Sequence, residues 1–115
     1  MDMTPAELED MLVTERDRAA KIGAAWAEYA GKVNSCEDRK TDYLAELTLK
    51  AEGKSIEERE RIARTSPEWA AFRKELSTAE AHALILKIEY QVAVRAWETA
   101  RSLLSSKNQE ARGYR

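Results

Sequence analysis

The sequence predicts an all-α protein, a long antiparallel coiled-coil helical hairpin with a short connecting helix. Two observations support this fold class. Only four of the 115 residues are glycine and two are proline, whereas 43% are hydrophobic and 35% are charged, so residues that end helices or form tight turns are scarce. Apolar residues also recur at alternating steps of three and four through two long segments, as in coiled coils. We expect one helical domain over residues 1–115.

The first helix is predicted over residues 5–51. It begins at Thr4-Pro5-Ala6-Glu7, a capping box with proline at the first helical position. Its predicted seam, at steps of four and three, consists of Leu8, Leu12, Glu15, Ala19, Ile22, Trp26, Tyr29, Val33, Cys36, Lys40, Tyr43, Leu47 and Lys50. Because Gly31 and Asn34-Ser35 lower helix propensity, a kink over 31–35 remains open.

A short second helix is predicted over residues 56–64. Gly53 suits the C-cap of the first helix, where glycine commonly adopts a left-handed conformation. Ser55-Ile56-Glu57-Glu58 is a second capping box, and Ser66-Pro67 is typical of a new helix start. The connector between the two long helices is therefore itself helical.

The last helix is predicted over residues 67–106, followed by a polar tail over 107–115. Its seam is apolar at every position and consists of Trp69, Phe72, Leu76, Ala79, Ala83, Leu86, Tyr90, Ala93, Trp97, Ala100 and Leu104. This is the strongest periodic signal in the chain, and it indicates an antiparallel partner helix.

The facing residues of the two long helices follow from the point at which the chain reverses. A reversal near residue 59 pairs residues whose numbers total about 117, so Tyr29 is predicted level with Ile88. The same register places Glu15, the acidic member of the first seam, beside Arg101. We therefore expect Glu15 and Arg101 to form an ion pair.

A second apolar stripe on the last helix exceeds what one partner helix can cover. Its members are Leu84, Ile85, Ile88, Val92 and Ala96. A helix that is apolar on two faces is typically buried on both. We interpret the stripe as the interface of a homo-oligomer, most simply a dimer that completes a four-helix bundle.

Sequence features that carry enzyme chemistry are missing, so we expect a non-enzymatic protein with no cofactor, no metal and no small-molecule substrate. The chain has one histidine, His82, and one cysteine, Cys36, and we interpret both as packing residues on or beside apolar faces. Neither a glycine-rich phosphate loop nor a Glu-x-x-His pair occurs. The aromatic residues on the two seams are expected to form core rather than a base-stacking surface.

Composition also bears on compartment. A single cysteine cannot form an intramolecular disulfide, and neither a signal peptide nor an apolar run of about 20 residues is visible. We expect a soluble, cytoplasmic protein that does not contact membranes.

The formal net charge of −2 excludes nucleic-acid binding through a strongly basic chain. The C-terminal end is nevertheless locally basic, and its cations are the predicted phosphate contacts if single-stranded DNA is bound. These residues are Arg101, Lys107, Arg112 and Arg115.

Three short segments carry a resemblance to a known group of proteins. They are Gly53-Lys54-Ser55-Ile56-Glu57-Glu58-Arg59, Ala79-Glu80-Ala81 and Arg101-Ser102-Leu103-Leu104-Ser105. In these segments and in layout the chain resembles small uncharacterised helical-hairpin proteins of tailed bacteriophages and prophages, encoded near recombination and single-strand-binding genes. The resemblance implies an accessory protein of phage DNA recombination or replication in the host cytoplasm. It would bind a partner protein, single-stranded DNA, or both.

Two other functions remain open from the sequence. One is a phage inhibitor of a host nuclease or defence protein, acting through an acidic helical surface. The other is a structural or scaffolding coiled coil without any link to DNA.

Overall fold

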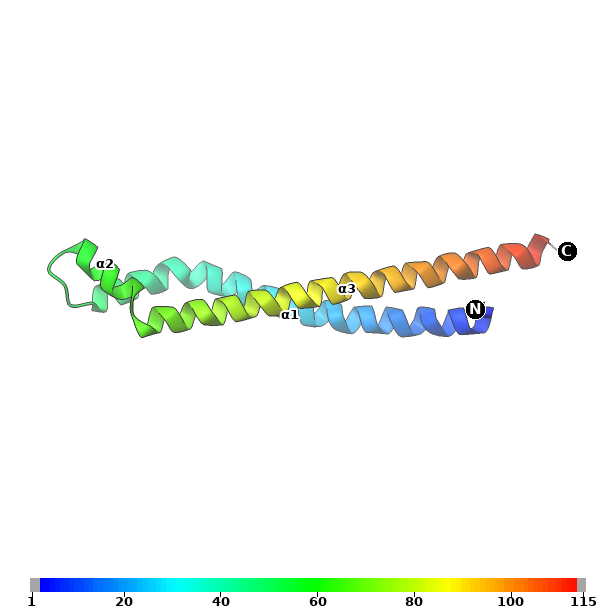
Figure 1. Cartoon of the computed structure of the whole chain (residues 1–115), viewed down its shortest axis with the longest axis horizontal. Helices are drawn as coiled ribbons and strands as arrows, with labels where there is room; N and C mark the ends of the chain where they lie inside the picture. The colour runs from blue at the N-terminus through cyan, green and yellow to red at the C-terminus, as the bar shows by residue number, and fades with distance from the viewer. Residues whose placement is uncertain (1–2, 114–115) are drawn as a thin grey trace. The chain divides into compact units, whose positions relative to one another are not determined.

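The computed structural model describes residues 3–113, which form the helices α1 (Pro5–Lys50), α2 (Ile56–Arg64) and α3 (Pro67–Gly113) (Figure 1). Helices make up 92% of these residues, and no strand occurs among them. The predicted fold class, an all-α helical hairpin with a short connecting helix, is confirmed. Residues 31–35, where a kink was in question, are helical throughout.

Side-chain caps set the start of each helix, as the sequence predicts. The amide of Glu7 donates to Thr4 Oγ1 at 3.2 Å, and that of Glu58 donates to Ser55 Oγ at 3.1 Å. At the start of α3 the amide of Trp69 donates to Ser66 Oγ at 3.2 Å. Each bond satisfies an amide that has no partner within its own helix.

Gly53 does not act as the predicted left-handed C-cap. Within residues 3–113 no glycine has a positive φ, and α1 ends three residues earlier, at Lys50. Gly53 instead allows a close approach to the first turn of α2, since a Cβ at this position would lie 3.2 Å from the backbone nitrogen of Arg59. The Gly53 carbonyl accepts a 2.9 Å hydrogen bond from Arg59 Nε. Glycine is therefore needed at this position because it has no side chain, and not because it can adopt a positive φ.

The predicted end of the last helix near residue 106 is wrong, because α3 continues to Gly113. Residues 107–112 are polar except for Ala111, but they include neither proline nor glycine, and all of them except Asn108 are good helix formers. Polarity at this end therefore reflects exposure to solvent and not loss of helix. Residues 114 and 115 of the predicted tail lie outside the described residues.

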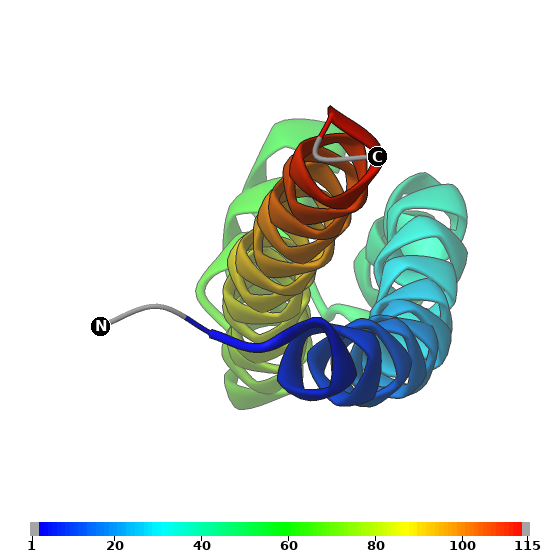
Figure 2. The ribbon, with the colours of Figure 1, turned by 90° about the vertical axis from the view of Figure 1, so that its right-hand side faces the viewer.

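The described residues divide into two compact units. Unit 1 comprises the residues up to Trp26 together with those from Ile85 onward, and unit 2 is Ala27–Leu84. In unit 1 the first turns of α1 and the last turns of α3 form an antiparallel pair, seen from the side in Figure 1 and from its end in Figure 2. Leu8, Ala93 and Ala100 are fully buried there, and the rings of Trp26 and Tyr90 lie 5.6 Å apart.

Unit 2 has a larger core, built around aromatic residues. Trp69 and Phe72 are buried with Leu76, Ala79 and Ala63. The Tyr43 ring from α1 lies 5.0 Å from the Phe72 ring and 6.4 Å from the Trp69 ring. Such aromatic contacts contribute stability beyond the area they bury.

The register of unit 2 differs from the prediction. Tyr29 stacks on His82, with ring centroids 5.0 Å apart, whereas the predicted level partner was Ile88, six residues or about 9 Å further along α3. The prediction assumed that the chain reverses near residue 59, in the middle of the connector between the two long helices. In the structure α2 and the last turns of α1 line shared hollows, so α2 folds back along α1. As a result, α3 begins beside Tyr43 rather than beside the end of α1.

Candidate functional site

The predicted second stripe on α3 is exposed to solvent. Ile85, Ile88 and Val92 in unit 1 are 54%, 52% and 51% exposed. Ala96 is half-buried, and Leu84, the last residue of unit 2, is also exposed. Three large apolar side chains therefore stand half in water on one helix face.

The stripe is separate from the seam that α3 forms with α1. At 100° per residue, the stripe and the seam of unit 1 are centred about 120° apart on α3. The seam residues of α3 in unit 1 are all buried or half-buried: Leu86, Tyr90, Ala93, Trp97, Ala100 and Leu104. The stripe residues therefore take no part in the packing of α3 against α1 in unit 1.

Leu103 extends the stripe and was missed by the sequence reasoning. It is 46% exposed and projects at the same angle as Ile85, five turns away. The polar Thr99 lies between Ala96 and Leu103 and interrupts the apolar pattern. The same residue spacing, continued past the polar Thr99, predicts Leu103 as a further member of the stripe.

Charge is distributed unevenly between the two helical segments of unit 1. Residues 1–26 contain six Asp and Glu against three Lys and Arg, whereas residues 85–115 contain three against six. The α1 segment is therefore acidic and the α3 segment is basic. This asymmetry favours pairing of unlike segments both within one chain and between chains.

In the structure, the cations predicted to contact DNA do not all lie on one face of α3. Arg101 lies over the Trp97 ring, with Cζ 5.0 Å from the ring centroid. Arg112 projects within about 20° of Arg101 on α3, but Lys107 projects about 120° away from Arg101. Arg115 lies outside the described residues. Arg101 and Arg112 thus share a face, and Lys107 belongs to another.

The predicted ion pair between Glu15 and Arg101 is wrong. Glu15 Oε2 lies 3.6 Å from Arg18 Nη1, one turn along α1, while Arg101 packs on Trp97. The side chain of Glu15 is only 15% exposed. Within residues 3–113, Oε2 has no hydrogen-bond partner.

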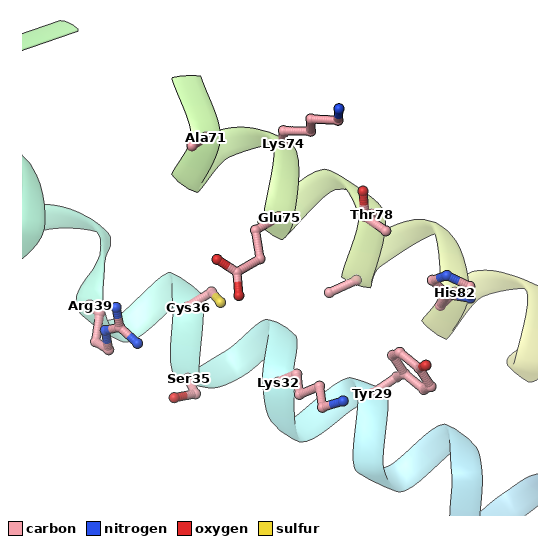
Figure 3. Close-up of a pocket in the computed structure, with 11 residues that line it drawn as sticks. Tyr29, Lys32, Ser35, Cys36, Arg39, Ala71, Lys74, Glu75, Thr78 and His82 are labelled. Carbon is pink, nitrogen blue, oxygen red and sulfur yellow. The ribbon is translucent and has the colours of Figure 1, made fainter. Parts of the chain in front are cut away.

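Cys36 and His82, both interpreted as packing residues, line one groove in unit 2 (Figure 3). Cys36 is half-buried, and His82 is exposed except where it stacks on Tyr29. The groove holds about 670 Å³ and was missed by the sequence reasoning, because α1 and α3 contribute its lining from distant parts of the chain. No group of three or more potential metal ligands occurs within residues 3–113.

Comparisons with known proteins add no relative. The chain matches no protein-family model, no curated protein and no solved structure. Among the described helices, none is long and apolar enough to cross a membrane.

Proposed function

We propose that this protein acts by binding, as a self-associating helical protein in which a second copy covers the α3 stripe. The proposal is supported mainly by Ile85, Ile88 and Val92, which are about half exposed. The seam of α3 beside them is already buried or half-buried against α1, so α1 of the same chain does not cover the stripe. Covering the exposed half of each side chain would contribute about 1 kcal/mol. A two-fold dimer uses the stripe of each copy, so this contribution occurs twice.

Charge favours the acidic α1 segment of the second copy as the surface that α3 meets. Two basic α3 segments facing each other would repel, whereas α3 against α1 joins unlike charges. The separation of about 120° between stripe and seam lets α3 contact two helices at once. The resulting dimer is a four-helix bundle.

Sedimentation equilibrium of wild type and two variants tests the association. Ile88→Glu places a charge in the stripe and should shift the protein from dimer to monomer at about 20 µM. Gln91→Glu is the matched control, since it adds the same charge at an exposed position of α3 outside the stripe, and should leave the dimer intact. A wild-type protein that is monomeric at 100 µM would refute the proposal.

The resemblance to phage helical-hairpin proteins supports a more specific role. We propose that the assembled protein works in the host cytoplasm as an accessory of phage DNA recombination or replication, and that it binds a partner protein there. The test is direct binding between the purified chain and the recombination or single-strand-binding protein encoded beside its gene. Absence of binding at 50 µM to every such neighbour would contradict this role.

Single-stranded DNA is a second candidate ligand, favoured by the last turns of α3. Residues 101–113 carry three cations against one carboxylate, Glu110, and most of them are exposed. Phosphate contacts through such cations weaken steeply as salt rises. A labelled oligonucleotide should therefore bind in low salt, and Lys107→Gln with Arg112→Gln should weaken binding and flatten its salt dependence. Arg16→Gln with Lys21→Gln removes the same charge from α1 and should have a smaller effect.

A further inference from the structure

In unit 1 the α3 stripe has a counterpart on α1, on the same side of the antiparallel pair. In such a pair, residues that precede the seam in angular order face the same side on both helices. Unit 2 illustrates this rule, because the groove of Figure 3 is lined by residues that precede the seam on α1 and on α3, such as Lys32 and Thr78. The stripe of unit 1 likewise precedes its own seam, by about 120°.

The matching surface of α1, here called the α1 flank, consists of Met11, Thr14, Arg18 and Ala25. These residues project about 60–120° before the α1 seam. Met11 and Ala25 are half-buried, while Thr14 and Arg18 are exposed. Val13 is also exposed, but it projects about 140° from the seam in the other direction. The α1 flank therefore lies beside the stripe, and Val13 does not.

The levels of the two helices in unit 1 follow from one aromatic contact. The rings of Trp26 and Tyr90 lie 5.6 Å apart, so these residues are close to level. Both helices rise about 1.5 Å per residue. Counting equal numbers of residues along α3 and back along α1 places Leu103 level with residue 13, next to Thr14 of the α1 flank.

Side-chain sizes at matching levels are complementary. By the same count, Val92 lies next to the level of Ala25, so that large stripe residues coincide with small flank residues. Arg18 is level with the stretch between Ala96 and Thr99, where the stripe has only small side chains and leaves room for a long one. Large residues opposite small ones are what close packing of two helices requires.

Symmetry carries these levels from one chain to two. If α3 of each copy contacts α1 of the other around a two-fold axis, the four helices alternate α1, α3, α1, α3 and the axis runs along the bundle. Such an axis keeps each residue level with its counterpart, so the levels within one chain also hold between chains. Each acidic α1 segment then has basic α3 segments as both neighbours.

We infer that the unit 1 segments of the two copies lie side by side in the same direction, with the α3 stripe of each copy on the α1 flank of the other. This arrangement rests on the proposed self-association, and it specifies the surface of α1 and the direction of the second copy. Val13 faces outward and takes no part, although it is more apolar than Thr14.

Cysteine pairs test the levels and the direction, in chains carrying Cys36→Ala so that no other thiol is present. Thr14→Cys with Leu103→Cys should form disulfides between copies, seen as a covalent dimer on a non-reducing gel. Both positions point away from the seam, so they do not meet within one chain. Val13→Cys with Leu103→Cys is the matched control and should not form the covalent dimer. Equal cross-linking of both pairs, or of neither, would overturn the arrangement.

Charge at the same two positions gives an independent test by sedimentation equilibrium. Thr14 and Val13 are adjacent and both exposed, so arginine at either should preserve the fold of a single chain. Thr14→Arg adds bulk and a charge that the basic α3 segment repels, and should raise the Kd of the dimer about tenfold. Val13→Arg should change it little.

The two possible failures can be told apart. Equal effects of Thr14→Arg and Val13→Arg on a wild-type protein that does form dimers would contradict the arrangement and leave the self-association standing. A wild-type protein that is monomeric at 100 µM would refute the self-association itself, and the arrangement with it.

Discussion

Glu15 places a carboxylate on the seam of α1, where its environment neither solvates nor neutralises it fully. Its side chain is 15% exposed, and Arg18 lies at 3.6 Å, beyond ordinary hydrogen-bond length. Oε2 has no hydrogen-bond partner in the described part of the chain. Desolvation of a charge with one distant partner costs free energy that an apolar residue would not.

We therefore expect Glu15→Leu to raise the free energy of unfolding by about 1–2 kcal/mol, measured by urea denaturation. Leucine continues the apolar seam and leaves Arg18 free to reach solvent. The control is Glu28→Leu, which replaces an exposed glutamate of α1 and should change stability by less than about 0.5 kcal/mol. A loss of stability on Glu15→Leu would mean that the carboxylate is favourable where it lies.

At the scale of helices, two glycines of α1 have opposite surroundings. A Cβ at Gly31 would meet no atom within 4 Å, whereas one at Gly23 would lie 3.3 Å from Tyr90 Cε2. Gly31→Ala should raise the free energy of unfolding by about 0.5–1 kcal/mol, the usual gain in helix propensity. Gly23→Ala should gain less or lose stability, because Tyr90 must shift. If thermal denaturation showed the same gain in stability for both variants, the Tyr90 side chain would shift at no cost in free energy, contrary to this expectation.

The start of α3 depends on one hydroxyl that serves two helices. Ser66 Oγ accepts from the Trp69 amide and donates to the carbonyl of Ala63 in α2 at 2.6 Å. We expect Ser66→Ala to lower the free energy of unfolding by about 1 kcal/mol. Ser77→Ala, at an exposed position within α3, should instead be neutral or slightly stabilising, since alanine is the better helix former. Both variants can be measured by chemical denaturation. A loss of stability in Ser66→Ala alone would show that Ser66 acts as a helix cap, whereas equal losses in both variants would contradict that role.

The helices and their seams could be predicted because periodicity and capping are local properties of sequence. The exposed stripe at Ile85, Ile88 and Val92 followed from the same projection. The contact of Trp26 with Tyr90 in unit 1 agrees with the predicted register, but the register of unit 2 could not be predicted, because it depends on α2 folding back along α1, which no heptad pattern encodes. The groove was missed for a related reason: its lining residues come from α1 and α3, which only the folded chain brings together.

For the molecule as a whole, the two units differ in how their cores are built. Unit 2 buries Trp69, Phe72 and Leu76, whereas the fully buried residues of unit 1 are Leu8 and two alanines. Large buried side chains contribute more stability than alanines do. Unit 1 should therefore open more readily when the chain is monomeric.

Hydrogen exchange followed by mass spectrometry should show this difference. At low protein concentration, amides of residues 5–26 and 85–104 should exchange faster than those of 36–47 and 67–80. Raising the concentration should slow exchange around residues 85–103, because association stabilises the form that binds. In Ile88→Glu this concentration dependence should disappear. Uniform exchange in both units would contradict the contrast between their cores.

The three tryptophans are distributed so that each unit has its own optical reporter. Trp69 lies in the aromatic cluster of unit 2, while Trp26 contacts Tyr90 and Trp97 lies beneath Arg101 in unit 1. A chain carrying Trp26→Phe and Trp97→Phe would emit from unit 2 alone, and one carrying Trp26→Phe and Trp69→Phe would emit from unit 1. Stopped-flow fluorescence of these two chains would time the opening of each unit separately, with no attached dye.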